Sequence, residues 1–219
     1  HVLGAGAPPS GAGDGTVVVV GGSVLDVYGK SEGADLAAGG SVLGTCRIVP
    51  GGVGRNVAAA LAALSAPLGA PPPLLVTCVG RDAAGEALLE SMRAGGVRTD
   101  GARTLAPPAA TAVVVSALGP DGEVGASVAD TRHLESGLDG AWVGRFRAEV
   151  AAAPVVIVDA NLCPAAMAAA AAAAGPAGRV WFEPVSVPKA GRIRGLGPCA
   201  YASPNEKELV EMAEALLPA

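Results

Sequence analysis

Residues 16–26 read TVVVVGGSVLD, and this stretch indicates the fold class of the chain. Four consecutive valines followed by two glycines predict a short strand over residues 16–20. Because both faces of such a strand are apolar, it is typical of a parallel sheet covered by helices on both sides. Asp26 follows a few residues later, near the edge where open α/β sheets bind ligands.

The rest of the chain alternates between predicted strands and predicted helices. Apolar runs predict strands at residues 74–79, 155–159, 179–183 and 199–202. Helical spacing predicts a helix directly after Gly52 with its apolar face at Val57, Ala60, Leu61 and Leu64, and others with faces at Ala84, Leu88 and Met92, across residues 164–174, and at Leu209, Met212 and Leu216. The alternation predicts an α/β fold with a doubly wound, mainly parallel sheet flanked by helices.

Gly-Pro-Asp-Gly at residues 119–122 interrupts this alternation. Turn sequences of this kind join antiparallel strands, and the flanking residues 111–118 and 123–128 are rich in strand formers. We therefore expect a hairpin that belongs to a separate, small sheet.

Composition excludes several classes of protein. The chain has 219 residues, of which 51% are hydrophobic and 16% charged, with a formal net charge of −5. It has no block of lysine or arginine for a nucleic-acid backbone, and its apolar runs are shorter than the roughly 20 residues of a membrane-spanning helix. We expect neither nucleic acid nor membrane as a partner.

The cysteines and the N-terminus bear on location. Four widely spaced cysteines without a CxxC pair favour reduced thiols in an intracellular protein over a metal or redox site. Residues 1–15 are mostly glycine, alanine and proline with one charge, which predicts a flexible leader. The chain starts at His1, so no N-terminal targeting signal is visible.

Polar residues near two of the predicted strands are candidates for ligand binding. Asp26 can accept hydrogen bonds from two neighbouring sugar hydroxyls, although an aspartate there is equally suited to capping a turn. Gly51, Gly52 and Asn56 open the next helix, where glycines let a ligand approach backbone amides and the asparagine both donates and accepts. A structural turn is the alternative, because the loop matches neither common phosphate-binding motif.

The C-terminal half offers further candidates. Asn161 follows the predicted strand at 155–159, and Glu183 ends the one at 179–183. Both are therefore candidates for ligand binding, with capping as the alternative role. Lys189 and Arg192 lie where a cation could meet a phosphate or the polar edge of a substrate, with solvated surface charge as the alternative. Residues 203–208, SPNEKE, begin the last helix, whose dipole alone would explain their acidic character.

These motifs occur in the order found in a known family. They are GG-x-x-x-D at 21–26, GG-x-x-x-N at 51–56, VGRD at 79–82 and SPNE at 203–206. The chain resembles the ribokinase-like (pfkB) sugar and nucleoside kinases from Thr16 to its last helix. The stretches VDANLCPAAM, VWFEPVSVPKAGRI and ASPNEKELVEMAEAL are similar to family members that phosphorylate pseudouridine.

The resemblance implies substrate-binding roles for several residues. Asp26 matches the acid that holds ribose hydroxyls in this family. Gly51, Gly52 and Asn56 match its glycine loop and sugar-binding asparagine. Asn161 lies where ribokinases carry a second sugar-contacting residue.

The resemblance also implies cofactors and a domain plan. Asn205 and Glu208 match the family's N-x-x-E pair, which organises magnesium and phosphate, so ATP and Mg²⁺ are the expected cofactors; dependence on a monovalent cation is left open. Residues 16–219 would form a C-terminally incomplete kinase domain. Segments of about 27–50 and 111–128 would form a small β lid, through which a homodimer could assemble.

One element of the family is missing from the sequence. The catalytic Gly-Ala-Gly-Asp, which supplies an anion hole at a helix start and the proton-accepting aspartate, does not occur after Asn205. The same letters at residues 11–14 precede a strand instead of a helix, so we interpret them as a coincidence. No residue of this chain is therefore assigned as the catalytic base.

These points define the expected function. The chain would be about the N-terminal two-thirds of a kinase that transfers the γ-phosphoryl group of ATP to the 5′-hydroxyl of pseudouridine. A kinase for ribose, fructose or adenosine and a non-catalytic nucleoside-binding protein are the alternatives. The cytoplasm is the expected compartment, with the peroxisome as an alternative.

Overall fold

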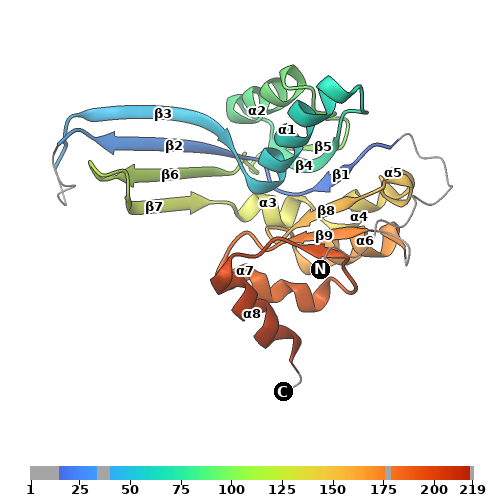
Figure 1. Ribbon diagram of the computed structural model, residues 1–219. Coiled ribbons are helices and arrows are strands. Elements are labelled where there is room, and N and C mark those ends of the chain that lie inside the picture. The colour runs from blue at the N-terminus through green and yellow to red at the C-terminus, as the bar shows by residue number, and fades with distance from the viewer. Residues whose placement is uncertain (1–14, 34–39, 176–178, 218–219) are drawn as a thin grey trace.

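The structure, a computed structural model, describes residues 15–33, 40–175 and 179–217. In these ranges the chain forms a large sheet between two layers of helices and a smaller sheet that projects away from it (Figure 1). The predicted leader lies outside the described residues except for Gly15, and the Gly-Ala-Gly-Asp sequence at 11–14 lies entirely outside them.

The large sheet is parallel in every strand pair of the described chain. Its strands in spatial order are β10 (Tyr201–Ala202), β9 (Val180–Glu183), β8 (Val156–Asp159), β1 (Val18–Val20), β4 (Leu74–Gly80) and β5 (Ala102–Leu105). The chain therefore winds outward from β1 in both directions, and the predicted doubly wound sheet is confirmed. The carboxyl ends of β1, β4 and β8 meet where the winding direction changes, which is the usual ligand-binding place in such sheets.

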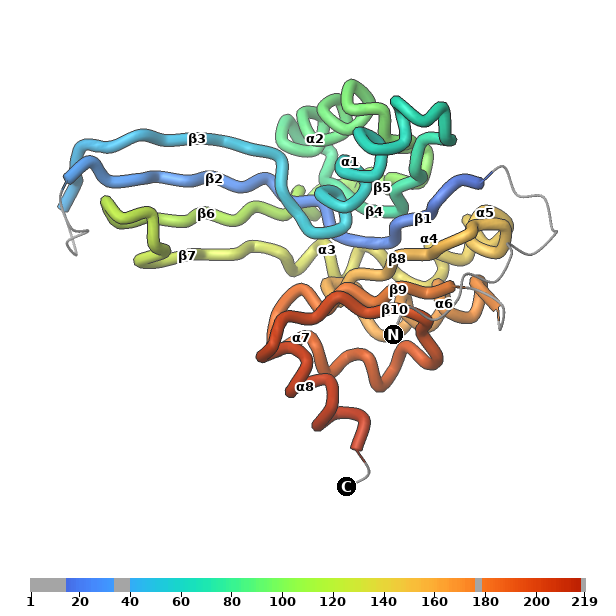
Figure 2. The backbone as a smooth tube through the Cα atoms, viewed as in Figure 1, coloured from blue at the N-terminus to red at the C-terminus, as the bar shows by residue number. Residues whose placement is uncertain are grey.

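Helices cover both faces of this sheet (Figure 2). One layer contains α1 (Val53–Ser65), the short η1 (Ala66–Leu68) and α2 (Ala83–Ala94); the other contains α3 (Arg132–Gly137), α4 (Gly140–Gly144), α5 (Arg147–Ala152) and α6 (Pro164–Ala174). Val19 packs into the core beneath α1 and α2, whereas Val18 and Val20 pack into the opposite core. The valine run thus supplies apolar side chains to both cores, because successive residues of a strand point to opposite faces.

The predicted apolar face of α1 is correct at Val57 and Leu61, which pack against the core, and wrong at two other residues. Ala60 and Leu64 are exposed. The buried residues of the helix are Gly54, Ala58 and Ala62. Their four-residue spacing places them on one face, and their small size lets the helix lie close to the sheet. In α2 the expected Leu88 and Met92 are both buried.

The small sheet contains four strands in the described residues. Its spatial order is β3 (Gly44–Gly51), β2 (Val24–Ser31), β6 (Val113–Leu118) and β7 (Val124–Asp130). β6 and β7 form the expected antiparallel hairpin, and β2 pairs with β6 in parallel. These strands come from the segments where a separate sheet was expected, but the sheet begins at Val24, so Asp26 lies inside it instead of before it.

The C-terminal part departs most from expectation. The helices α3 to α5, of five or six residues each, have no counterpart in the predicted elements. After β9 the chain forms α7 (Val187–Ala190), η2 (Gly191–Gly195) and α8 (Glu206–Leu216). In α8 only Met212 of the predicted apolar face is buried, whereas Leu209 and Leu216 are exposed because no described element covers that side.

No helix in the described ranges has the length and apolar character required to cross a bilayer.

Candidate substrate site

Asp26 lies on the small sheet where β2 meets the end of β3. The Tyr28 hydroxyl donates a hydrogen bond to Oδ2 of Asp26 at 3.2 Å. A Cβ at Gly51 would come within 1.9 Å of the same oxygen, so the carboxylate occupies the space that this glycine leaves free. Burial raises the pKa of Asp26, while the Tyr28 hydrogen bond and the positive charge of Arg55 lower it. The site is thus a half-buried carboxylate beside one hydroxyl and one cation.

The two glycine loops are in direct backbone contact. Gly52 precedes α1 with a φ of 91°, and a Cβ there would come 2.5 Å from the carbonyl oxygen of Gly22. A Cβ at Gly54 would come 2.6 Å from the Cα of Gly21. Larger residues would push the loops apart, so glycine is required by packing at these positions. Asn56 lies one turn into α1 and is exposed.

Asn161 and Lys189 meet beside the first glycine loop. Lys189 Nζ donates to Oδ1 of Asn161 at 2.6 Å, and a Cβ on Gly22 would lie 3.5 Å from Asn161 Nδ2. Burial lowers the pKa of Lys189 and the charge of Arg192 lowers it further, whereas Asp159 and Glu135 raise it. The structure thus brings Asn161 and Lys189 to the carboxyl end of β1, and Lys189 is not a freely solvated charge.

Arg192 is held by the protein itself. Its guanidinium donates to the carbonyl oxygens of Ala160 at 3.1 Å and Leu162 at 2.8 Å. It also forms a 2.8 Å ion pair with Glu135. These contacts join the loop after β8 to α3, so the structure favours a structural role for Arg192 over the predicted contact with phosphate or substrate.

Glu183, Asn205 and Glu208 form a second group near β9 and α8. Ser203 donates to Glu183, whose other oxygen accepts from the amide of Val185. Asn205 Oδ1 accepts from the Glu208 amide at 3.0 Å, and Glu208 Oε2 accepts from the Asn205 amide at 2.9 Å. This reciprocal capping box accounts for the placement of both residues at the helix start. Their role toward magnesium and phosphate stays a prediction.

The VGRD motif connects the two sheets. Asp82 begins α2, where Oδ1 accepts from the Gly85 amide at 2.8 Å. The amide of Thr111, just before β6, donates to Oδ2 at 2.8 Å, and its hydroxyl donates to Oδ1 at 2.6 Å. One carboxylate therefore holds the end of β4, the start of α2 and the entry to the small sheet together.

Replacement of Asp82 by asparagine is expected to lower stability at neutral pH by about 1 kcal/mol, the typical worth of a hydrogen bond or cap. Burial raises the pKa of Asp82, but hydrogen bonds from Thr111 and the backbone outweigh it, so the pKa falls below its ordinary 3.8. The Asp82 carboxylate therefore stabilises the folded chain above pH 3.8. This stabilisation disappears as the pH falls through the lowered pKa of the folded state.

Urea unfolding of both chains at pH 7 and below pH 3 measures this difference. The gap between the two unfolding free energies should shrink in acid. A gap that is equal at both pH values would contradict the assignment, and Asp121→Asn in the exposed β6–β7 turn is the charge-matched control.

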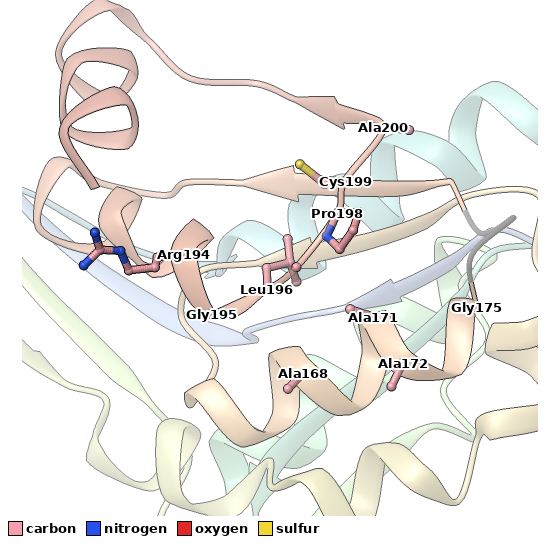
Figure 3. Close-up of a pocket in the computed structure, with 11 residues that line it drawn as sticks. Ala168, Ala171, Ala172, Gly175, Arg194, Gly195, Leu196, Pro198, Cys199 and Ala200 are labelled. Carbon is pink, nitrogen blue, oxygen red and sulfur yellow. The ribbon is translucent and has the colours of Figure 1, made fainter. Parts of the chain in front are cut away.

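A cavity of about 830 Å³ lies away from all of these groups (Figure 3). Ala168, Ala171 and Ala172 of α6 form one wall, and residues 194–200 form another. None of the predicted site residues lines it. It is bounded by the C-terminal part of α6, whereas the candidate residues gather at the carboxyl ends of the strands.

The structure thus sorts the predicted site residues into two groups. Asp26, Gly51 and Gly52 lie at the joint between the sheets, with Asn161 and Lys189 beside them, and the second group lies at β9 and α8. Convergence of Asn56 with Asp26 on one ligand stays a prediction. Sequence reasoning missed Tyr28 and Arg55, although Tyr28 follows Asp26 by two residues, the spacing that shares one face of a strand.

The two sheets define an α/β protein whose large sheet is doubly wound, a fold in which ligands bind at the carboxyl ends of the strands. The sequence matches the description "pfkB family carbohydrate kinase" over residues 14–218. The chain belongs to this family.

Individual relatives agree with this assignment. The chain is 34% identical over 205 residues to a pseudouridine kinase of Arabidopsis thaliana, covering 91% of this chain and 50% of that protein. It is 29% identical over 152 residues to a pseudouridine kinase of Escherichia coli K12, covering 69% of this chain and 46% of the relative. The chain spans about half the length of these curated relatives.

A solved structure shares the fold. Ribokinase of Arabidopsis thaliana, solved in complex with ribose and ATP, superimposes with a TM-score of 0.67 at 21% identity. The match covers 91% of this chain and 68% of the ribokinase.

Proposed function

We propose that this chain supplies the nucleoside-binding part of a kinase that phosphorylates the 5′-hydroxyl of pseudouridine with ATP. The observation that carries the proposal is the half-buried Asp26 carboxylate beside the glycine loops, at the carboxyl end of β1. A carboxylate that accepts two hydrogen bonds suits a pair of ribose hydroxyls. The pseudouridine kinases among its relatives support this substrate over ribose, fructose or adenosine.

Each residue of the joint has a defined task in this proposal. Asp26 accepts from the ribose hydroxyls, while the Tyr28 hydrogen bond orients the carboxylate, and Tyr28 and the charge of Arg55 oppose the rise in its pKa that burial causes. Gly51 leaves room for the Asp26 carboxylate, Gly52 lets the two loops pack together, and Asn56 and Asn161 add donors and acceptors. Lys189 fixes the amide of Asn161 by occupying its oxygen.

ATP and Mg²⁺ are the cofactors of the proposed reaction. The described residues hold no cluster of three or more histidine, cysteine, aspartate or glutamate side chains suited to a metal. Mg²⁺ commonly binds through one or two carboxylates together with nucleotide phosphates. Glu208, supported by Asn205, fits that limited role. The metal would neutralise charge on the transferred phosphoryl group.

A thermal-shift screen tests the substrate class. Pseudouridine, uridine, adenosine and ribose are added separately to the protein, and a ligand that binds only the folded state raises the unfolding midpoint. Pseudouridine is expected to give the largest shift. No shift with any nucleoside would contradict the proposal, and a larger shift with ribose or adenosine would favour another sugar kinase. Binding without phosphorylation by any protein containing this chain would favour the non-catalytic alternative.

The outer face of the small sheet supports the proposed homodimer. Register partners share one face of a sheet, and Ile48, Val27, Val115 and Val128 form one row across the four strands. The exposed fractions of Ile48, Val115 and Val128 are 67%, 50% and 73%. The next row, Cys46, Gly29, Ala117 and Ala126, is also uncharged.

The opposite face carries Asp26, Tyr28 and Arg47, and its Asp26 row also includes Val49 and Val114. Two copies can therefore pack their apolar faces together without like-charge repulsion and leave the substrate face of each copy accessible.

Val128→Lys is expected to convert a dimer into a monomer, because it places two charges in an apolar contact. Analytical ultracentrifugation measures the mass, and Asp121→Lys in the exposed turn is the control. The fold of the single chain should stay intact, since Val128 is exposed there, and the unfolding midpoint should lose only the contribution of the dimer. The proposed dimer through the outer face of the small sheet would be contradicted if the chain without substitution is a monomer. It would also be contradicted if the Val128→Lys chain is still a dimer.

A further inference from the structure

Asp159 is a buried carboxylate that no substrate can touch. Only 1% of its surface is exposed. Its Oδ2 accepts from the amides of Gly22 at 2.8 Å and Gly54 at 2.9 Å, and its Oδ1 accepts from the Asn161 amide at 3.0 Å. The three donors belong to three segments: the connection from β1 to β2, the first turn of α1, and the loop after β8.

All three segments carry candidate substrate groups, and Asn161 itself belongs to the loop after β8. Gly22 lies four residues before Asp26, and Gly54 lies between Gly52 and Asn56 in the sequence. The segments also touch each other, since a Cβ on Gly21 would come 2.8 Å from the Cα of Gly54 and 2.5 Å from Asp159 Oδ2. The carboxylate oxygen thus lies between two backbones that have no room for a side chain of their own.

We propose that Asp159 is a positioning residue, whose shared carboxylate oxygen holds both glycine loops in the register that aligns Asp26 with the start of α1. The proposal rests on the proposed nucleoside site, because Asp26, Gly52 and Asn56 of that site belong to these two segments. It differs from a capping role, which satisfies amides of one helix only. Here a single oxygen links two segments that are 32 residues apart in sequence, counted as 54 − 22.

The chemistry requires a carboxylate at this position. A carboxylate accepts at both oxygens, whereas an asparagine side chain presents one acceptor and one NH₂ donor. In Asp159→Asn, the side-chain NH₂ group would point either at the two glycine amides or at the Asn161 amide, and a donor would then face a donor. Burial raises the pKa of Asp159, and the amide hydrogen bonds oppose that rise. The conservative variant therefore keeps the shape of the side chain and removes its ability to serve all three donors.

Two measurements on the 219-residue chain test the proposal. The first measurement follows hydrogen exchange at the Gly22 and Gly54 amides by NMR. The second measures the dissociation constant of pseudouridine by calorimetry, under conditions where Asp159→Asn and the control Asp100→Asn are fully folded. In Asp159→Asn we expect exchange at both amides to accelerate, and pseudouridine affinity to fall, each by at least about tenfold. Asp100→Asn, which removes an exposed ion-paired carboxylate, should change neither.

The outcomes separate this proposal from the function on which it rests. If Asp159→Asn lowers the unfolding midpoint but leaves the affinity of the folded chain unchanged, Asp159 is only structural and the proposal is overturned. If the unchanged chain binds no nucleoside, the proposed function fails and amide exchange alone decides whether Asp159 holds the loops.

A third measurement covers the case in which Asp159→Asn does not fold. The Gly22 and Gly54 amides of the unchanged chain should then show scalar couplings to the Asp159 carboxyl carbon across their hydrogen bonds. Absence of these couplings would overturn the proposal, and their presence at both amides would support it.

Discussion

Incubated with ATP, Mg²⁺ and pseudouridine, the 219-residue chain is expected to form no detectable pseudouridine 5′-phosphate. Transfer needs a base within hydrogen-bond reach of the 5′-hydroxyl and amide donors around the moving phosphoryl group. The resemblance assigns both to a Gly-Ala-Gly-Asp sequence, which does not occur after Asn205. Loss of such a unit typically lowers the rate by several orders of magnitude.

Sensitive detection of the product by mass spectrometry checks this expectation, with Asp14→Asn as the informative variant. Product that the chain forms but Asp14→Asn does not would show that the N-terminal Gly-Ala-Gly-Asp is catalytic. Product that survives the substitution would place the base elsewhere in these residues. Either result would contradict the expected inactivity.

Replacement of Asp26 by alanine is expected to weaken pseudouridine binding by about 1.5–3 kcal/mol, the typical worth of hydrogen bonds to a charged acceptor. This corresponds to a roughly ten- to hundredfold higher dissociation constant. Tyr28→Phe should have a smaller effect, because it removes a group that orients the carboxylate and leaves the carboxylate itself in place.

Calorimetric titration measures both variants against the unchanged chain. Asp121→Ala, in the exposed turn at the far end of β6, removes a carboxylate without touching the joint and should leave the affinity unchanged. An unchanged affinity in Asp26→Ala would remove Asp26 from the substrate site.

The central sheet was predictable because its signal is local. A run of valines between a glycine-rich segment and two glycines has few alternatives to a buried strand, and the two cores require an apolar residue at each position. Residues 164–174 form a helix with the predicted bounds, since proline and alanine favour its start and interior.

Helix faces were less predictable because they depend on what lies opposite. In α1, Gly54 and Ala58 face the sheet in place of the larger Leu64, because close approach to the Gly21 backbone requires small residues. In α8, Leu209 and Leu216 are spaced like buried residues, but no described element packs against them. Periodicity shows that a helix has an apolar face but does not identify its partner.

The candidate site shows the same limit. Motif spacing was sufficient to select Asp26 and the glycine loops, but not to distinguish groups that contact a ligand from groups that hold the loops. Asp159 and Asn161 are two residues apart, yet only Asp159 is fully buried against Gly22 and Gly54. That difference arises from contacts between distant segments, which no local pattern encodes.

A titration of the isotopically labelled chain with pseudouridine, followed by NMR, tests the central claim most directly. The account predicts that ligand-induced shifts concentrate at Asp26, Gly52, the Asn56 side-chain amide and Asn161, whereas Val128 on the outer face of the small sheet does not respond. Shifts that instead cluster around the cavity between α6 and residues 194–200, or that are absent at saturating nucleoside, would contradict a nucleoside site at the joint of the two sheets.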